Sequence, residues 1–237
     1  MIDLLDRIEG RPGGAELRGS GAGVDDLLRR LAEGEPPAAV ADAAGPGALD
    51  LIAALAFGAL GDPQGPALVR SKPRWLGLAQ ALTADALEPL LPDSGRPERL
   101  ALAAGLLQVH DFWAESHEAA QEADDLGEGK TAAYWHGVAH RREPDPGNAA
   151  YWFRRVGKHP LFEPLGAAAR GLIRGHDGPV PADAERLIRG GSWDPMAVIE
   201  LGRAARPGSA AESLARRLQR IELAALLAAS AGNAGAG

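Results

Sequence analysis

Cysteine is absent from this chain of 237 residues. Its absence excludes disulfide bonds, thiolate metal ligands and a cysteine nucleophile. A chain of this length can bury a stable core without such cross-links. Because proteins of the reducing cytoplasm do without disulfides, we expect a cytoplasmic protein.

An excess of positive charge is also missing, since 25 Lys and Arg residues stand against 32 Asp and Glu residues, for a net charge of −7. Proteins that bind nucleic acid or anionic membranes through charge need a basic surface. The most apolar stretch, Ala48–Leu60, is too short to span a bilayer. Residues Met1–Asp6 have neither the basic nor the apolar segment of a secretory signal. We therefore expect a small-molecule ligand or substrate as the partner, and neither nucleic acid nor a membrane.

The motifs of several enzyme classes are lacking. Despite 31 glycines, neither standard form of the glycine-rich phosphate loop is present. No G-x-S-x-G turn presents a serine nucleophile. His117-Glu118 is not followed by the second histidine of the metalloprotease helix. No motif therefore names a reaction.

Strand patterns are not found, because no window alternates Val, Ile and Thr with polar residues. Helical patterns recur instead, and we predict an all-α protein, an irregular helical bundle. We divide it into a loop-rich helical region over 1–95 and a helical domain with the site over 96–230. A tail over 231–237 is predicted to be disordered, because it has nothing to bury.

Turn and capping signals set the bounds of the predicted helices. Pro97 suits the first turn of a helix, Asn148 suits an N-cap, and Ser209 begins a capping box. The predicted ranges are Val24–Ala32, Leu49–Leu60, Pro73–Leu91, Pro97–Asp125, Thr131–Arg142, Asn148–Val156, a helix that starts after Asp194, and Ser209–Ser230.

Chemically interesting side chains are concentrated between His110 and Phe162. These 53 residues hold five of the six histidines and eight of the eleven aromatic residues. On a single helix over 97–125, His110 and His117 lie within about 40° of each other on the apolar side. His136 and His140 are four residues apart and share one face of the next helix. Four histidines should thus point inward.

Two interpretations of these histidines are open. Neutral imidazole is the commonest metal ligand, and Glu143, Asp145 or Asp111 could complete a site for zinc, iron or manganese. In that case all four histidines are ligands. Alternatively they form a buried polar network, in which each ring is satisfied by its own hydrogen-bond partner.

Arginines and aromatic residues lie close to the histidines in sequence. The pairs Arg141-Arg142 and Arg154-Arg155 could hold an anionic substrate, because guanidinium groups bind carboxylate and phosphate through two hydrogen bonds. Each pair also ends a predicted helix, where positive charge is favourable for structure alone. Tyr134 and Trp152 could line a pocket or anchor the core.

A set of short runs in the second part resembles an uncharacterised family of bacterial and fungal proteins, over about residues 100 to 228. The runs are His110-Asp111-Phe112, Glu115-Ser116-His117, Tyr134-Trp135-His136, His140 to Asp145 with Asn148, Tyr151 to Gly157, His159-Pro160, Trp193-Asp194-Pro195, and Gln219 to Leu226 with Glu222. The family has no established activity. The resemblance implies that its histidines and arginines form one shared arrangement. Met196 departs from the aromatic residue expected there, and a methionine fills similar space.

Our leading hypothesis is a metal-dependent enzyme, a hydrolase of a small polar or anionic substrate, with Glu143 or Asp145 as general base or further ligand. The alternatives are a metal-free helical protein that binds a small anion and a structural or interaction module. Four imidazole nitrogens that converge on one point with an open position would favour the enzyme. Histidines that are each satisfied by their own hydrogen-bond partner, with no adjoining cavity, would count against it. Free arginines beside a cavity would favour the anion-binding protein.

Overall fold

The computed structural model describes residues 23–44 and 47–235. Every regular element in these ranges is a helix and none is a strand, which confirms the all-α prediction. No helix within them combines the length and the apolar character needed to cross a membrane. The predictions for Met1–Asp6 and for the last two residues of the tail lie outside the described residues.

Short helices make up the first part of the described chain. They are α2 (Val24–Ala32), α3 (Pro37–Ala44), α4 (Ala48–Leu60), α5 (Leu78–Ala81), α6 (Ala84–Leu87) and the 3-10 helix η2 (Glu88–Leu90). The predicted helices over 24–32 and 49–60 are confirmed. The single helix predicted over 73–91 is wrong, because the chain there forms three short helical turns. Thr83 accepts a hydrogen bond from the amide of Ala86 and so starts a new helix within that range.

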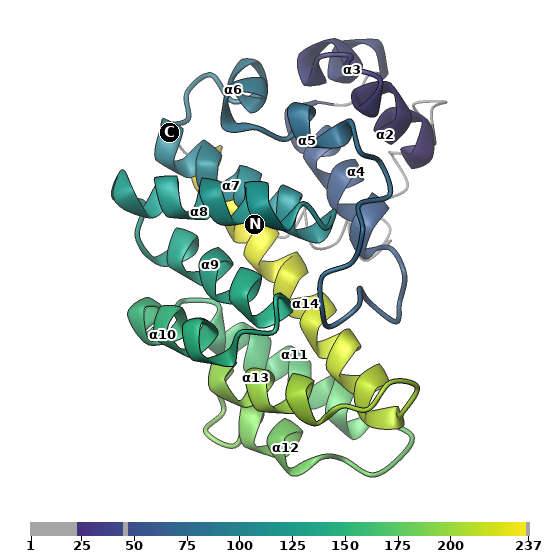
Figure 1. The fold of residues 1–237 in the computed structure, drawn as a ribbon, viewed down its shortest axis with the longest axis vertical. Helices are drawn as coiled ribbons and strands as arrows, with labels where there is room; N and C mark the ends of the chain where they lie inside the picture. Colours follow the sequence, from purple (N-terminus) through teal and green to yellow (C-terminus); the bar gives the residue numbers. More distant parts are fainter. Residues whose placement is uncertain (1–22, 45–46, 236–237) are drawn as a thin grey trace.

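Four successive helices hold the chemically interesting region. They are α7 (Arg96–Val109), α8 (Trp113–Asp125), α9 (Lys130–Arg142) and α10 (Pro146–Val156). Figure 1 shows α8, α9 and α10 stacked one beside the next, with α7 alongside α8. This stack brings side chains of neighbouring helices face to face.

The single helix predicted from Pro97 to Asp125 is wrong, because the chain reverses between α7 and α8. At the reversal Asp111 has a φ of 66°, in the left-handed region that Asp tolerates better than most residues. Its carboxylate accepts hydrogen bonds from Arg142 Nη2 at 2.7 Å and from Ser71 Oγ at 2.9 Å. These partners are distant in sequence, so tertiary contacts hold a turn that the helical pattern of the sequence did not indicate.

The N-cap of α10 also differs from the prediction. Asp145, rather than Asn148, occupies this position, and its carboxylate accepts a hydrogen bond from the backbone N–H of Asn148 at 3.0 Å. The helix therefore begins at Pro146, whose missing N–H costs nothing in a first turn.

The remaining helices are α11 (Phe162–Arg174), α12 (Ala182–Ile188), α13 (Pro195–Ala204) and α14 (Ala210–Ala234). Asp194 and Ser209 cap α13 and α14 as predicted, each through its side chain. Helix α14 continues past the predicted end at Ser230, and Ala231 and Ala234 are buried. The prediction of disorder is therefore wrong for residues 231–234, because these alanines do find a surface to pack against.

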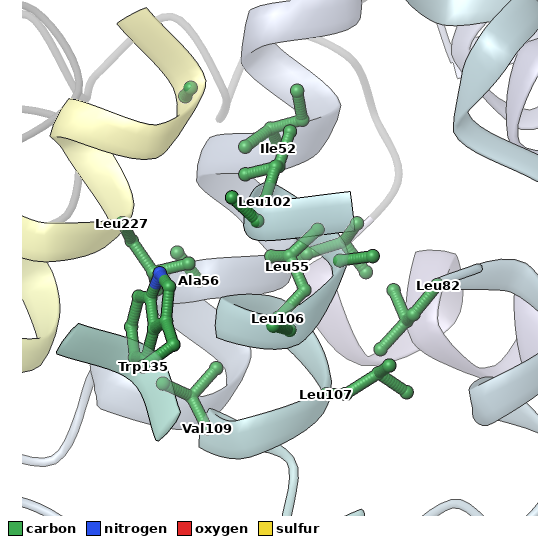
Figure 2. Packing of buried hydrophobic residues seen from close by; sticks show 14 of the residues in the cluster. Ile52, Leu55, Ala56, Leu82, Leu102, Leu106, Leu107, Val109, Trp135 and Leu227 are labelled. Atoms are coloured by element: carbon green, nitrogen blue, oxygen red, sulfur yellow. The ribbon is translucent and has the colours of Figure 1, made fainter. Parts of the chain in front are cut away.

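Within the described ranges, buried hydrophobic side chains form two clusters. The larger one draws on the first helices, on α7 to α10 and on the second half of α14. Figure 2 shows part of it, with Ile52 and Leu55 of α4 close to Leu102 and Leu106 of α7. The smaller cluster joins α11, α12, α13 and the first half of α14. The predicted boundary near residue 95 therefore does not separate two cores.

Candidate metal centre

Three histidines converge between α8 and α9. His117 comes from α8, and His136 and His140 come from α9. Each offers one ring nitrogen, and these three atoms all lie within 4.8 Å of one another. The Nε2 atoms of His117 and His136 are only 2.8 Å apart. We call these three residues the histidine cluster.

Helical spacing and helix packing together produce the histidine cluster. His136 and His140 are one turn apart, and their rings stack with centroids 5.0 Å apart. Helix α8 packs along α9 (Figure 1), so the ring of His117 meets both, with centroid distances of 4.2 and 5.0 Å. The pair on α9 could be predicted from the sequence, whereas the position of His117 depends on the reversal before α8.

Burial favours the neutral form of His117 and His136. His136 and His140 are buried, with exposures of 2% and 8%, and His117 is half-buried. Burial, with the neighbouring His117 and His140, lowers the pKa of His136 to about 3. Burial also lowers the pKa of His117, and His140 adds to the effect. Neutral imidazole is the form that binds a metal ion.

A carboxylate orients one member of the histidine cluster. Nδ1 of His140 lies 3.1 Å from Oε2 of Glu143, which is partly exposed. A carboxylate there favours the proton on Nδ1 and leaves the lone pair of Nε2 free, as in many metal sites. Asp145 forms a second possible metal-binding group with Glu143 and His140. Each residue offers one ligand atom, and the three atoms lie within 4.8 Å of one another. Its own carboxylate caps α10, and the amide of Asn148 lowers its pKa.

Nδ1 of His136 has no hydrogen-bond partner among the described residues, although it is buried. A purely structural network normally satisfies every buried polar group, because an unmade hydrogen bond is costly. An ion bound at Nε2 would leave this nitrogen unpaired as well, so Nδ1 of His136 fits neither interpretation better than the other.

Two tryptophans stack on the histidine cluster. The ring of Trp152 lies 3.8 Å from that of His136 at an interplanar angle of 14°, and Trp113 stacks on His117 at 5.2 Å. Trp113 is fixed by its indole N–H, which donates to the carbonyl of Ala139 at 2.9 Å. The sequence pointed to Trp152 as a site residue. It did not single out Trp113, although its spacing of four from His117 was a usable signal.

His110 is not part of the histidine cluster, which corrects the predicted set of four ligands. Its Nε2 lies 2.9 Å from the carbonyl oxygen of Leu55 on α4, and burial lowers its pKa to about 4. The physical reason is the break between α7 and α8, which turns His110 and His117 toward different neighbours.

Arg141, Arg142 and Tyr134 have structural positions that do not fit the predicted substrate binding. Arg141 forms a buried pair with Glu222, at 2.5 Å between Nη2 and Oε2. The hydroxyl of Tyr134, which is fully buried, donates to the same carboxylate at 3.0 Å. Burial raises the pKa of Tyr134 well above its usual value. Arg142 is buried against Asp111, at 2.7 Å.

The second arginine pair lies on the surface of α10. Arg155 pairs with Asp124 at 2.7 Å, and its guanidinium lies 5.6 Å from the ring centre of Trp152. Arg154 is exposed, and no carboxylate in the described part of the chain pairs with it. The structure thus brings Trp152 to the histidine cluster and leaves the Arg154 guanidinium at the surface.

Comparison of the chain with protein-family models, curated proteins and solved structures found no match. The resemblance noted from the sequence therefore stays a prediction, and the histidine cluster is the feature from which a function can be inferred.

Proposed function

We propose that the protein is a metal-dependent enzyme, a hydrolase of a small polar substrate, whose ion is held by His117, His136 and His140. The observation that supports this proposal is the convergence of three imidazoles from two helices. Three protein ligands leave coordination positions open for water and substrate, which is the arrangement of catalytic rather than structural zinc sites.

The ligand chemistry favours a transition metal. Imidazole nitrogens suit zinc, iron, nickel and copper, whereas magnesium and calcium prefer oxygen ligands. Two nitrogens bound tetrahedrally to one zinc ion lie about 3.3 Å apart. The His117–His136 distance of 2.8 Å is slightly shorter. A small outward movement of the half-buried His117 ring would accommodate the ion, so we favour zinc, with iron and manganese as the further candidates.

Glu143 and Asp145, the two carboxylates beside the histidine cluster, have different roles in the proposed enzyme. An ion bound there would activate a water molecule for attack on the substrate. Glu143 holds His140 in the tautomer that binds metal, through the contact at 3.1 Å. Asp145 is committed to the cap of α10, so it positions this segment instead of accepting a proton. Glu143 is the better placed of the two for proton transfer, because its carboxylate does not cap a helix.

The metal-free alternatives lack comparable support. Of the arginines that the sequence predicted to hold an anion, Arg141, Arg142 and Arg155 are in ion pairs, and Arg154 lies exposed on the surface of α10. A structural network explains the contact between His117 and His136, but not why His140 brings a third ring nitrogen within 4.8 Å of both. A metal site explains why imidazole nitrogens gather so closely in a buried place.

Elemental analysis of protein purified without an affinity tag or a chelator tests the proposal. We expect about one zinc, iron or manganese ion per chain, and its loss in a His117→Ala/His140→Ala variant. The matched control is His110→Gln, which removes a histidine outside the cluster and should keep the ion. The loaded protein should then hydrolyse at least one member of a panel of esters, amides and phosphoesters.

Two results would overturn the proposal. One is a protein that takes up none of these ions even after supplementation. The other is a metal content that is the same in the double variant as in the native protein, provided that circular dichroism shows both to be folded.

A further inference from the structure

Arg70 stands beside the histidine cluster, although it is far from it in sequence. Its guanidinium carbon lies 4.7 Å from the ring centre of Trp113. That ring stacks on His117, with centroids 5.2 Å apart. Together the two distances limit the separation between the Arg70 guanidinium and the His117 ring centre to about 10 Å.

Hydrogen bonds tie this arrangement to the helix that carries the other two histidines. The backbone N–H of Arg70 donates to the carbonyl of Arg142 at 2.8 Å. The indole N–H of Trp113 donates to the carbonyl of Ala139 at 2.9 Å. Both acceptors are in the last turn of α9, close to His140. The position of Arg70 relative to the histidine cluster is therefore fixed by the fold.

The charge of Arg70 is not compensated within the described residues. It is exposed, and no carboxylate among them pairs with it. By contrast, Arg155 on the other side of the cluster is neutralised by Asp124 at 2.7 Å. Arg154 also has no ion pair in the described ranges, but it is exposed on α10 and does not stack on either tryptophan of the cluster. A cation stacked on an indole keeps its fork of N–H groups available for an anion.

We propose that Arg70 binds an anionic group of the substrate while the reacting group of the same molecule reaches the metal ion. This inference rests on the proposed function and names its substrate class, which is a small elongated anion. Its charged carboxylate or phosphate lies at one end and its reacting bond at the other. The limit of about 10 Å restricts the substrate to a few bonds between these two ends.

A series of carboxylates of increasing length measures the distance between the metal ion and the Arg70 guanidinium. Acetate, malonate, succinate and glutarate are titrated into the cobalt-loaded protein, and binding is followed by the visible absorption of the ion. In the native protein we expect one dicarboxylate to bind about tenfold more tightly than acetate, because it contacts both the ion and a guanidinium fork. Arg70→Gln should remove this gain and leave the affinity for acetate unchanged.

Arg74→Gln is the matched control. Arg74 also stacks on an indole, that of Trp75 at 5.0 Å, but it pairs with Asp25 and does not touch the histidine cluster. This variant should keep the preference for the dicarboxylate. The inference is overturned if Arg70→Gln binds every carboxylate as the native protein does, or if no dicarboxylate exceeds acetate. If the protein still binds cobalt normally, only the inference about Arg70 is overturned and the proposed function stands. If the protein does not bind cobalt, the inference and the proposed function are both overturned.

Discussion

Nε2 of His117 and Nε2 of His136 lie 2.8 Å apart, although the two residues belong to different helices and are separated by 19 positions. In the metal-free protein one ring donates its proton to the lone pair of the other, so at least the accepting ring is neutral. Burial lowers the pKa of both imidazoles and so favours this state. Neutral rings are also the form that a metal ion would need, so the fold holds the candidate ligands His117 and His136 close together without an ion.

We expect the contact between Glu143 and His140 to strengthen metal binding. Replacing Glu143 by Ala removes the carboxylate 3.1 Å from Nδ1 of His140 and should weaken zinc affinity by about 10- to 100-fold. Competition with a chromophoric chelator measures this change. Glu115→Ala, at an exposed acid of α8, should leave the affinity unchanged. Equal affinities of the two variants would show that Glu143 does not support the site.

The fold was predictable where its determinants are local. The proline after Glu143 ends α9, and Asp194 and Ser209 cap the helices that follow them. The reversal between α7 and α8 was not predictable. It depends on hydrogen bonds from Arg142 and Ser71 to Asp111, which are 31 and 40 positions away.

In the candidate site, too, the features set by local spacing were predictable and those set by long-range contacts were not. His136 and His140 could be predicted as an inward pair, because a spacing of four residues fixes their common face. His117 was predicted from a helix that proved to be broken, and it still points inward because α8 packs on α9. Arg70 could not be found from sequence, since it reaches Trp113 across 43 positions through contacts that only the folded chain creates.

The buried ion pair between Arg141 and Glu222 should be essential for stability. Glu222 is fully buried and also accepts hydrogen bonds from Tyr134 and Trp193. Replacing Glu222 by Gln leaves the Arg141 charge buried without compensation, at a cost of about 3–5 kcal/mol in the free energy of unfolding. Urea denaturation measures this loss.

The control for that substitution is Glu200→Gln. Glu200 pairs with Arg203 at 3.0 Å, and both side chains are largely exposed. The loss of an exposed pair costs less than about 1 kcal/mol. If the two variants lost similar stability, the buried network around Glu222 would not have the role that its contacts indicate.

Close packing of α9 against α10 depends on Gly137. A Cβ atom at this position would lie 2.8 Å from the ring of Phe153, next to Trp152 in sequence. Gly137→Ala should therefore destabilise the protein by about 1–3 kcal/mol. Gly171→Ala on α11 is the matched control, because a Cβ atom there meets nothing within 4 Å. That substitution should stabilise the protein by about 0.5–1 kcal/mol, and thermal denaturation of both variants would reveal opposite signs.

The stability of the protein should fall in mild acid, partly through His110. Burial lowers the pKa of this imidazole to about 4, below the usual value of about 6.5 that applies to the unfolded chain. Between these two values the unfolded chain binds a proton that the folded protein excludes. The stabilisation from neutral His110 is thus fully present above pH 6.5 and is lost as the pH falls toward 4, by up to about 3 kcal/mol.

His110→Gln isolates this contribution, because a glutamine amide can still donate to the carbonyl of Leu55 but does not titrate. Urea denaturation of both proteins at pH 7.5, 5.5 and 4.5 gives the comparison. The native protein should lose more stability than the variant over this range, since only its side chain at position 110 takes up a proton on unfolding. Parallel loss in both proteins would mean that His110 already accepts a proton in the folded state, and that the acid sensitivity comes from other groups.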